Sequence, residues 1–295
     1  MAYILLKPLK VQPNVSLSHI KPIIDKQKLI KMKKTLRRLA PVALVLVALV
    51  TLSFMAKDGV TLRLRPQQGK TYTVTTKANM MTMMEVQGQT MNMSQSMETR
   101  QIFTAKEVTG TQSILETQIE AMKMTISQMG MKLEYDSEHP EKNSPMLAGQ
   151  TKDIEAKLHQ PTDITYDVLG KLVGDSIDAS MNQLGVIIEM PENEVTVGST
   201  WTNTTSQETS GMEFSADITY TVKAISRKSI DLTYTGKVNG NVADISGTYE
   251  GTASIDPQTG IMMSNSQKQN ISMTISEQGM NIPMTIVGNT TVEVK

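Results

Sequence analysis

Residues 212–224, MEFSADITYTVKA, alternate between apolar and polar side chains. The even positions carry Met, Phe, Ala, Ile, Tyr, Val and Ala, whereas the odd positions carry Glu, Ser, Asp, Thr, Thr and Lys. Because successive side chains of a β-strand point to opposite faces, this stretch predicts a strand with one buried and one solvated face. Such strands are typical of antiparallel sheets. The same alternation returns in four later runs, Ile230–Tyr234, Tyr249–Ile255, Ile271–Ile275 and Met280–Ile286.

Short polar segments separate these runs, at residues 226–229, 239–241, 256–260 and 277–279. They are rich in the Ser, Asn, Asp, Pro and Gly residues that hairpin turns use, so the pattern predicts a meander. A strand over residues 212–224 would be about 43 Å long at about 3.3 Å per residue, which is longer than usual. We therefore expect the sheet to twist and to curl into a groove or a partial barrel.

The first half of the chain repeats the pattern with different residues. Gly69–Tyr72 resembles Gly198–Trp201, and Phe103–Val108 resembles Tyr220–Ile225, at offsets of 129 and 117 residues. The similar offsets suggest an internal duplication. We expect a mainly β protein with two similar antiparallel curved sheets, arranged as a sandwich or a partial barrel, with a short, partly helical segment in the middle.

The middle segment, residues 137–195, shows helix signals in place of strand alternation. A helix is predicted to begin at Ser144-Pro145 and to end before Pro161, and a second one is predicted over 175–185. Between them, residues 163–173 predict a small hairpin. We expect the helices to cover an open face or edge of the sheets. The expected organisation is a first β unit over 57–136, this connector over 137–195 and a second β unit over 196–295.

The charges of the chain are unevenly distributed. Residues 1–56 hold ten Lys or Arg and one Asp, so residues 57–295 hold 19 basic and 28 acidic side chains and a net charge of −9. Nucleic-acid binding relies on Lys and Arg contacts to phosphates and on aromatic stacking, so no nucleic-acid partner is expected. The absence of Cys excludes disulfides, thiolate zinc sites and iron–sulfur clusters.

An apolar leader explains this unevenness. Residues 39–56 are uncharged and follow a cluster of Lys and Arg at 31–38. Residues 32–56 therefore predict either a signal peptide that is removed or a membrane anchor that is kept, with its basic flank inside. Residues 1–31 have no clear periodicity, and we expect them to be a dispensable extension or the result of a start assigned too early. In both cases residues 57–295 are exported to the periplasm or cell envelope, anchored in the inner membrane through residues 39–56 if the leader is uncleaved.

Several short motifs have a distinctive composition: QGQTMNM at 87–93, IEAMKM at 119–124, MKLEYDS at 131–137 and the Gly-x-x-Trp at 198–201. Over residues 60–295 the chain resembles an uncharacterised family of exported Bacteroidota proteins, a domain of unknown function with Met-rich strands. Many members look like lipoproteins, from which this chain departs because it has no Cys. The resemblance implies a compartment and a fold and brings no activity.

The most unusual feature of the composition is its high number of methionines. Twenty of the 23 methionines lie in residues 57–295, and eleven fall between Met80 and Met131. They can fill a core that is poor in aromatic residues, or line a concave face that adapts to a lipid or another apolar ligand. Thioethers also bind Cu(I), so a copper site is the alternative. Its candidate ligands are spaced two residues apart on strands: Met81 and Met83, Met91 and Met93, Met122 and Met124, and Met129 and Met131.

No catalytic constellation stands out, so we expect no enzyme and no cofactor other than the alternative copper. Only His139 and His159 remain as imidazole bases in residues 57–295, and neither belongs to a nucleophile motif. The acidic loop 136–138 could supply oxygen ligands to calcium, but a turn at a strand end is the simpler interpretation. We predict an exported, non-enzymatic β protein of the envelope that binds an apolar ligand or a protein partner. A periplasmic Cu(I)-binding protein is the alternative.

Overall fold

The computed structural model describes residues 59–295 except 87, 175–185, 210–211, 241–243 and 278–279. The predicted leader and the predicted helix at 175–185 therefore lie outside the described residues. Asp58–Lys295 form one compact unit. The helices among the described residues are too short or too polar to cross a membrane.

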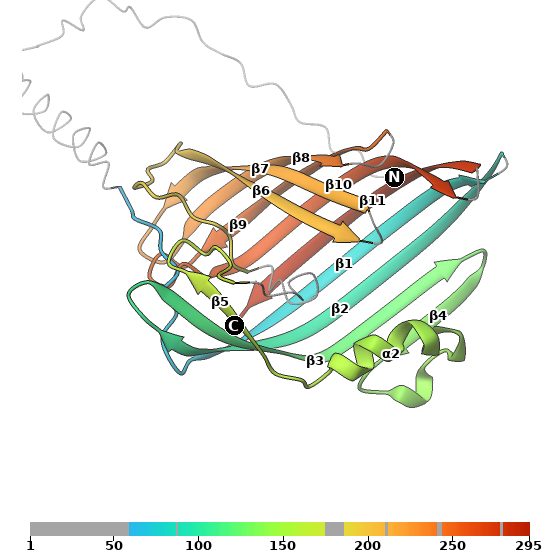
Figure 1. Cartoon of the computed structure of the whole chain (residues 1–295), viewed down its shortest axis with the longest axis horizontal. Coiled ribbons are helices and arrows are strands. Elements are labelled where there is room, and N and C mark those ends of the chain that lie inside the picture. The colour runs from blue at the N-terminus through green and yellow to red at the C-terminus, as the bar shows by residue number, and fades with distance from the viewer. Residues whose placement is uncertain (1–58, 87, 175–185, 210–211, 241–243, 278–279) are drawn as a thin grey trace, which may run out of the picture. The chain divides into compact units, whose positions relative to one another are not determined.

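The described strands form a single antiparallel sheet in the order β4-β3-β2-β1-β11-β10-β9-β8-β7-β6, with β5 paired to β3 (Figure 1). Consecutive strands are neighbours almost throughout, as expected for a meander. The strands are β1 (Thr71–Val86), β2 (Gln89–Val108), β3 (Gln112–Gln128), β4 (Met131–Asp136), β5 (Thr162–Asp167), β6 (Thr200–Thr209), β7 (Met212–Ile225), β8 (Ile230–Gly240), β9 (Ser246–Ile255), β10 (Met262–Glu277) and β11 (Met280–Val294).

The prediction of a mainly antiparallel β protein is confirmed, but the two expected sheets are joined into one. Strand β1 pairs with β11 from Val74–Val294 to Met84–Met284. This pairing satisfies backbone groups that would otherwise be exposed along the edges of two separate sheets. The first and last strands of the unit therefore lie side by side in the middle of the sheet (Figure 1).

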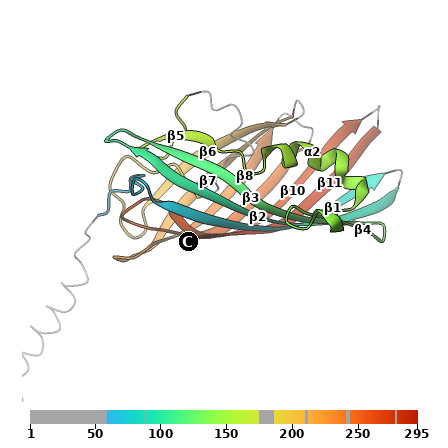
Figure 2. The same ribbon diagram turned by 90° about the horizontal axis from the view of Figure 1, so that it is seen from below.

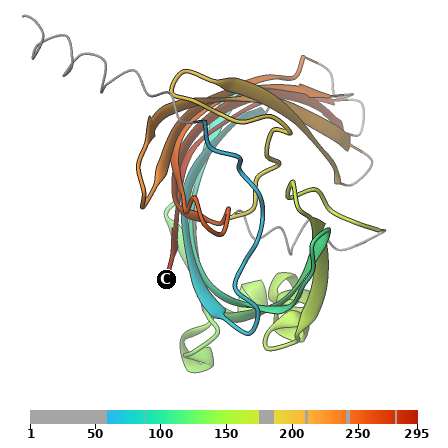
Figure 3. The same ribbon diagram turned by 90° about the vertical axis from the view of Figure 1, so that its left-hand side faces the viewer.

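The sheet curves around one of its faces, here called the inner face (Figure 3). On β1 the inner-face residues are the even-numbered ones from Tyr72 to Met84, and the odd-numbered ones lie on the outer face. The inner face is covered at one end, where Leu62, Leu64, Val186 and Ile188 pack against it from the segments before β1 and β6. This contact forms the main hydrophobic core.

Two stacked aromatic pairs occupy the covered end. The rings of Tyr72 and Phe103 lie 4.7 Å apart, and those of Trp201 and Tyr220 lie 5.2 Å apart. These four residues are the aromatic positions of the two aligned motif pairs, so the sequence similarity between the halves coincides with equivalent cross-strand contacts. The similarity is thus carried by packing of the core as well as by strand composition.

The connector adds one helix to the inner side of the sheet. Two 3₁₀ turns, η1 (Pro140–Lys142) and η2 (Pro145–Leu147), precede helix α2 (Ala148–Lys157). Leu147 and Ile154 pack with Met122, Met124 and Tyr135 of β3 and β4. Figure 2 shows α2 beside the sheet, whereas β5 is itself a strand of the sheet and pairs with β3. The predicted helix before Pro161 and its covering role are therefore confirmed.

Buried tyrosines predict how stability depends on pH. Burial raises the pKa of Tyr166 to about 12, and burial, opposed by a hydrogen bond to Asn265, raises the pKa of Tyr234 to about 12. In the unfolded chain both groups ionise near pH 10, so the unfolded state loses protons first. Their stabilisation is complete below about pH 10 and is lost as the pH rises to about 12, by up to about 2–3 kcal/mol per tyrosine.

Alkaline titration measures this effect. We expect the tyrosinate absorbance and the loss of the sheet's circular dichroism signal to rise together above pH 10. Tyrosines that all ionise near pH 10 while the sheet signal persists would show that these side chains are solvated.

Candidate functional site

The inner face changes character along the strands. Beyond the covered end lies a polar belt, formed by Gln95 of β2 and by Asn265, Gln267 and Gln269 of β10. The register places these residues on the inner face, because they pair through β1 and β11 with its inner positions. Side chains that can both donate and accept hydrogen bonds therefore cross the middle of the curved sheet.

Hydrogen bonds connect this belt to its surroundings. The Tyr234 hydroxyl lies 2.8 Å from Asn265 Oδ1 and 3.2 Å from Gln267 Oε1. The Gln95 amide donates to the Met124 sulfur at 3.5 Å, and the Gln269 amide donates to the Met80 sulfur at 3.8 Å. A thioether is a weak acceptor, so these two amides remain available for a stronger partner.

Beyond the belt the inner face becomes apolar. Part of this region packs with Val238, Ile245 and Tyr249 in a hydrophobic cluster, and we call the whole region the distal patch. Its side chains are half-buried except Met273, which is buried. Being unbranched, methionine can adapt to differently shaped apolar partners. The distal patch consists of Met84, Met91, Met93, Met273, Ile275, Ile282, Met284 and Ile286.

The described side chains on the inner face of the central strands carry no formal charge. Among the described side chains of β1, β2 and β8–β11, no Lys, Arg, Asp or Glu occupies an inner-face position of the strand register. The charges lie on the outer face, where Lys77 and Glu98 are 3.4 Å apart and Lys268 and Glu250 are 4.0 Å apart. Such exposed pairs contribute little to stability. The arrangement separates a charged outer face from an uncharged inner one.

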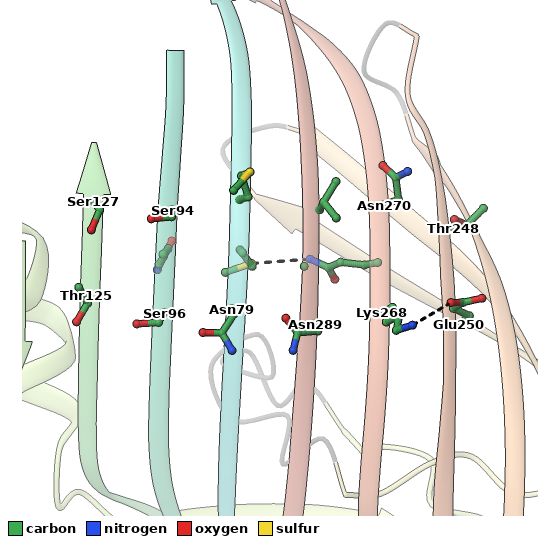
Figure 4. A pocket seen from close by; sticks show the side chains of 16 residues that line it. Asn79, Ser94, Ser96, Thr125, Ser127, Thr248, Glu250, Lys268, Asn270 and Asn289 are labelled. Atoms are coloured by element: carbon green, nitrogen blue, oxygen red, sulfur yellow. Dashed lines mark hydrogen bonds and ion pairs between the residues drawn. The ribbon is translucent and has the colours of Figure 1, made fainter. Parts of the chain in front are cut away.

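The outer face has a shallow depression of its own, with a volume of about 860 Å³ (Figure 4). It crosses β3, β2, β1, β11, β10 and β9, and short polar side chains such as Asn79 and Asn289 line it. Met81 and Val287 also line it, at 49% and 43% exposure, and so do Met80, Gln95 and Gln269, whose register places them on the inner face. Because the side chains that line the depression are largely exposed, it offers a ligand little desolvated surface.

The first two methionine pairs lie on opposite faces of the sheet. Met81 and Met83 of β1 project from the outer face, whereas Met91 and Met93 of β2 project from the inner face, where Met91 pairs with Met84. The pairs are therefore separated by the backbone of the sheet. The alternation predicted that the two members of each pair lie on the same face of their strand. It could not predict whether different pairs lie on the same face of the sheet.

The other two pairs lie in different surroundings from each other. Met122 and Met124 are 8% exposed and pack beneath α2 with Leu147. Met129 lies in the turn between β3 and β4 and is 75% exposed, and Met131 at the start of β4 is 53% exposed. The structure nevertheless gathers five of the eight predicted methionines, because Met81, Met91, Met93, Met129 and Met131 line one hollow of about 560 Å³, whereas Met83, Met122 and Met124 do not line it. The methionines that it does align with Met91 are Met84, Met284 and Met273, which lie on neighbouring strands.

The remaining candidates occupy ordinary surface positions. His139 is exposed and lies 3.4 Å from Glu141. Asp136 and Glu138 of the acidic loop form ion pairs with Lys123 at 3.3 and 3.4 Å. Among the described residues no group of three His, Asp or Glu side chains is placed to hold a metal ion.

The fold defines an antiparallel β protein built on one curved sheet. The model of a family of unknown function (DUF6263) matches residues 169–262, which include β6 to β9. The match is to an uncharacterised family, in agreement with the predicted resemblance, and covers a smaller part of the chain than residues 60–295. None of the curated proteins compared matches the chain.

Solved structures show weak likenesses. A structure of lipid–protein interactions in lipovitellin has a TM-score of 0.46 and 12% identity over 78% of this chain, which spans 25% of the lipovitellin chain. An outer membrane channel from Pseudomonas putida F1 has a TM-score of 0.26 and 9% identity, covering 81% of this chain and 98% of the channel. The translocator domain of the autotransporter NalP from Neisseria meningitidis has a TM-score of 0.19 and 10% identity, covering 90% of this chain and 96% of that domain.

Proposed function

We propose that this protein is a non-enzymatic, exported binding module whose inner face takes the apolar chain of an uncharged amphipathic ligand. The observation that carries the proposal is the half-buried distal patch, which lies next to the polar belt among described inner-face side chains that carry no charge. An acyl chain is the simplest ligand with this division into an apolar and a polar part.

The distal patch supplies the attraction for the apolar chain. Half-buried methionine and isoleucine side chains still expose apolar surface, and covering it is favourable by about 25 cal/mol per Å². Six residue steps from Met80 to Val86 span about 20 Å along β1 at about 3.3 Å per residue. A long acyl chain can therefore lie along the strands between the polar belt and the far end of the sheet.

The polar belt supplies selectivity for the polar end. The amides of Gln95 and Gln269 can exchange weak thioether contacts for stronger hydrogen bonds to ester, hydroxyl or amide groups of a ligand. A carboxylate or phosphate would be desolvated there without a cation on the same face to pair with it, which is costly. The arrangement therefore favours an uncharged polar end.

The leader would determine where in the cell the binding module is located. Its export through residues 32–56, and its attachment to the membrane if residues 39–56 are kept, would hold the inner face close to a source of acyl chains. Envelope localisation and acyl-chain binding thus support each other in this proposal.

Competition binding tests the proposal. The full chain, recovered from the envelope of cells that express it, is loaded with a fluorescent monoacylglycerol, and unlabelled monoolein or oleate is added at pH 8. We expect monoolein to displace the probe at a concentration at least about tenfold lower than oleate, the equivalent of about 1.4 kcal/mol. Equal or better displacement by oleate would contradict the selectivity, and no saturable probe binding would contradict the function.

A further inference from the structure

Four methionines form a continuous row across the inner face. Met91 of β2 is the register partner of Met84 on β1, Met84 is the partner of Met284 on β11, and Met284 is the partner of Met273 on β10. We call this row the methionine ladder. It crosses four adjacent strands, although its members are up to 200 positions apart in the sequence.

The spacing of the ladder allows its sulfur atoms to meet. Directly opposite residues of antiparallel strands have Cβ atoms about 4.5–5.5 Å apart. The methionine sulfur lies two bonds beyond Cβ on a side chain with three rotatable bonds, so sulfurs from neighbouring strands can converge on a point above the strand between them. Met84 is flanked on both sides, and three thioethers, those of Met91, Met84 and Met284, can therefore surround one ion.

The surroundings of the ladder select the kind of ion. Thioethers are soft, uncharged ligands that suit Cu(I), whereas carboxylates and carbonyls suit Mg²⁺, Ca²⁺ and Mn²⁺. Among the described side chains no carboxylate occupies an inner-face position on these four strands, and the next row toward the covered end holds Met93, Thr82, Ile286 and Ile271. A site of neutral sulfur ligands on an uncharged, partly desolvated face disfavours a divalent cation more than a monovalent one.

We propose that Met84, Met91 and Met284 form a binding site for a soft monovalent cation, Cu(I) or Ag(I), with Met273 as a fourth sulfur at its edge. Met273 is 7% exposed, and the other three are half-buried, which leaves the site accessible from the open side of the inner face. The site is separate from the pairs Met81/Met83 and Met122/Met124. It goes beyond acyl-chain binding because it uses the sulfur atoms of the distal patch and not only their apolar surface.

Leucine substitution separates these two uses of the surface. Leucine keeps an apolar side chain of similar volume but has no thioether, and such swaps in a core cost less than about 1.5 kcal/mol. The double variant Met84→Leu/Met284→Leu removes two of three proposed ligands. Its matched control, Met81→Leu/Met83→Leu, removes two thioethers from the same strand on the outer face.

The experiment is a titration of the full-chain protein with Ag(I), and with Cu(I) under ascorbate, against a chromophoric chelator. We expect one strong site in the parent and in the control, and at least tenfold weaker binding in Met84→Leu/Met284→Leu. X-ray absorption of the copper-loaded parent should show sulfur-only coordination. Unchanged affinity in that double variant, an equal loss in the control, or oxygen and nitrogen coordination would overturn the site.

The acyl-chain proposal is tested in the same variants. Monoacylglycerol binding should be retained in Met84→Leu/Met284→Leu, because the patch stays apolar. Loss of the metal with retention of the acyl probe supports the site, and the far-ultraviolet circular dichroism of each variant verifies its fold. A parent that binds the acyl probe but not the metal would overturn the metal site alone.

Discussion

Replacing Phe103 by alanine is expected to lower the free energy of unfolding by about 3–5 kcal/mol, the range measured for phenylalanine truncations in cores. Phe103 has no exposed surface, and its ring stacks on Tyr72 at a centroid distance of 4.7 Å with an interplanar angle of 13°. The substitution leaves a cavity next to Leu62 and Leu64 in the main core and removes an aromatic contact.

Urea unfolding followed by circular dichroism measures this loss. The control is Ser96→Ala on the same strand, where an exposed outer-face side chain is truncated and the expected change is within about 0.5 kcal/mol. Similar stability of the Phe103→Ala variant and the parent would mean that the covered end of the inner face is not the core that holds the sheet together.

The local structure could be predicted well because it depends on neighbouring residues. The alternation over 212–224 predicted the strand that the structure shows as Met212–Ile225, and the Ser-rich segment 226–229 forms the hairpin turn in which Ser226 Oγ accepts from the Ser229 amide at 2.9 Å. Period and turn chemistry are properties of a few consecutive residues. A sequence therefore contains this information directly.

The union of the two halves could not be predicted in the same way. Pairing of β1 with β11 joins residues that are 200 to 220 positions apart, and no local pattern identifies which edges of two units will meet. Both strands alternate, so each would also fit the edge of a separate sheet. The sequence alone therefore suggested two sheets where the structure has one.

For the candidate site, too, the local pattern could be predicted from the sequence, whereas the long-range arrangement could not. The spacing of two residues predicted that Met91 and Met93 lie on one face of their strand, as the structure shows. It made Met81 and Met83 equally good candidate ligands, although these two residues lie on the outer face. Met84, the central residue of the methionine ladder, lies next to Met83 and was not selected, because only its register with Met91 and Met284 distinguishes it. Interstrand register is thus the missing information for the site.

A negative charge in the distal patch is expected to abolish acyl-chain binding. Ile286 lies on the inner face between Thr82 and Ile271, and the Ile286→Asp variant would place an unpaired carboxylate against the bound chain. The penalty for desolvating such a charge is several kcal/mol, so we expect at least about 100-fold weaker binding of the monoacylglycerol probe. Ile282→Asp, nearer the end of β11, should have the same effect and serves if Ile286→Asp lowers stability too far.

In the proposed function the ligand binds to the inner face and not to the depression on the outer face. The most direct test compares Ile286→Asp with Val287→Asp, since these neighbours on β11 carry the same new charge to opposite faces and Val287 lines the outer depression. Each variant is titrated with the fluorescent monoacylglycerol. We predict that Val287→Asp binds within about threefold of the parent, a difference of about 0.7 kcal/mol or less, and that Ile286→Asp shows no saturable binding. Binding that is lost in Val287→Asp and kept in a folded Ile286→Asp would contradict the account.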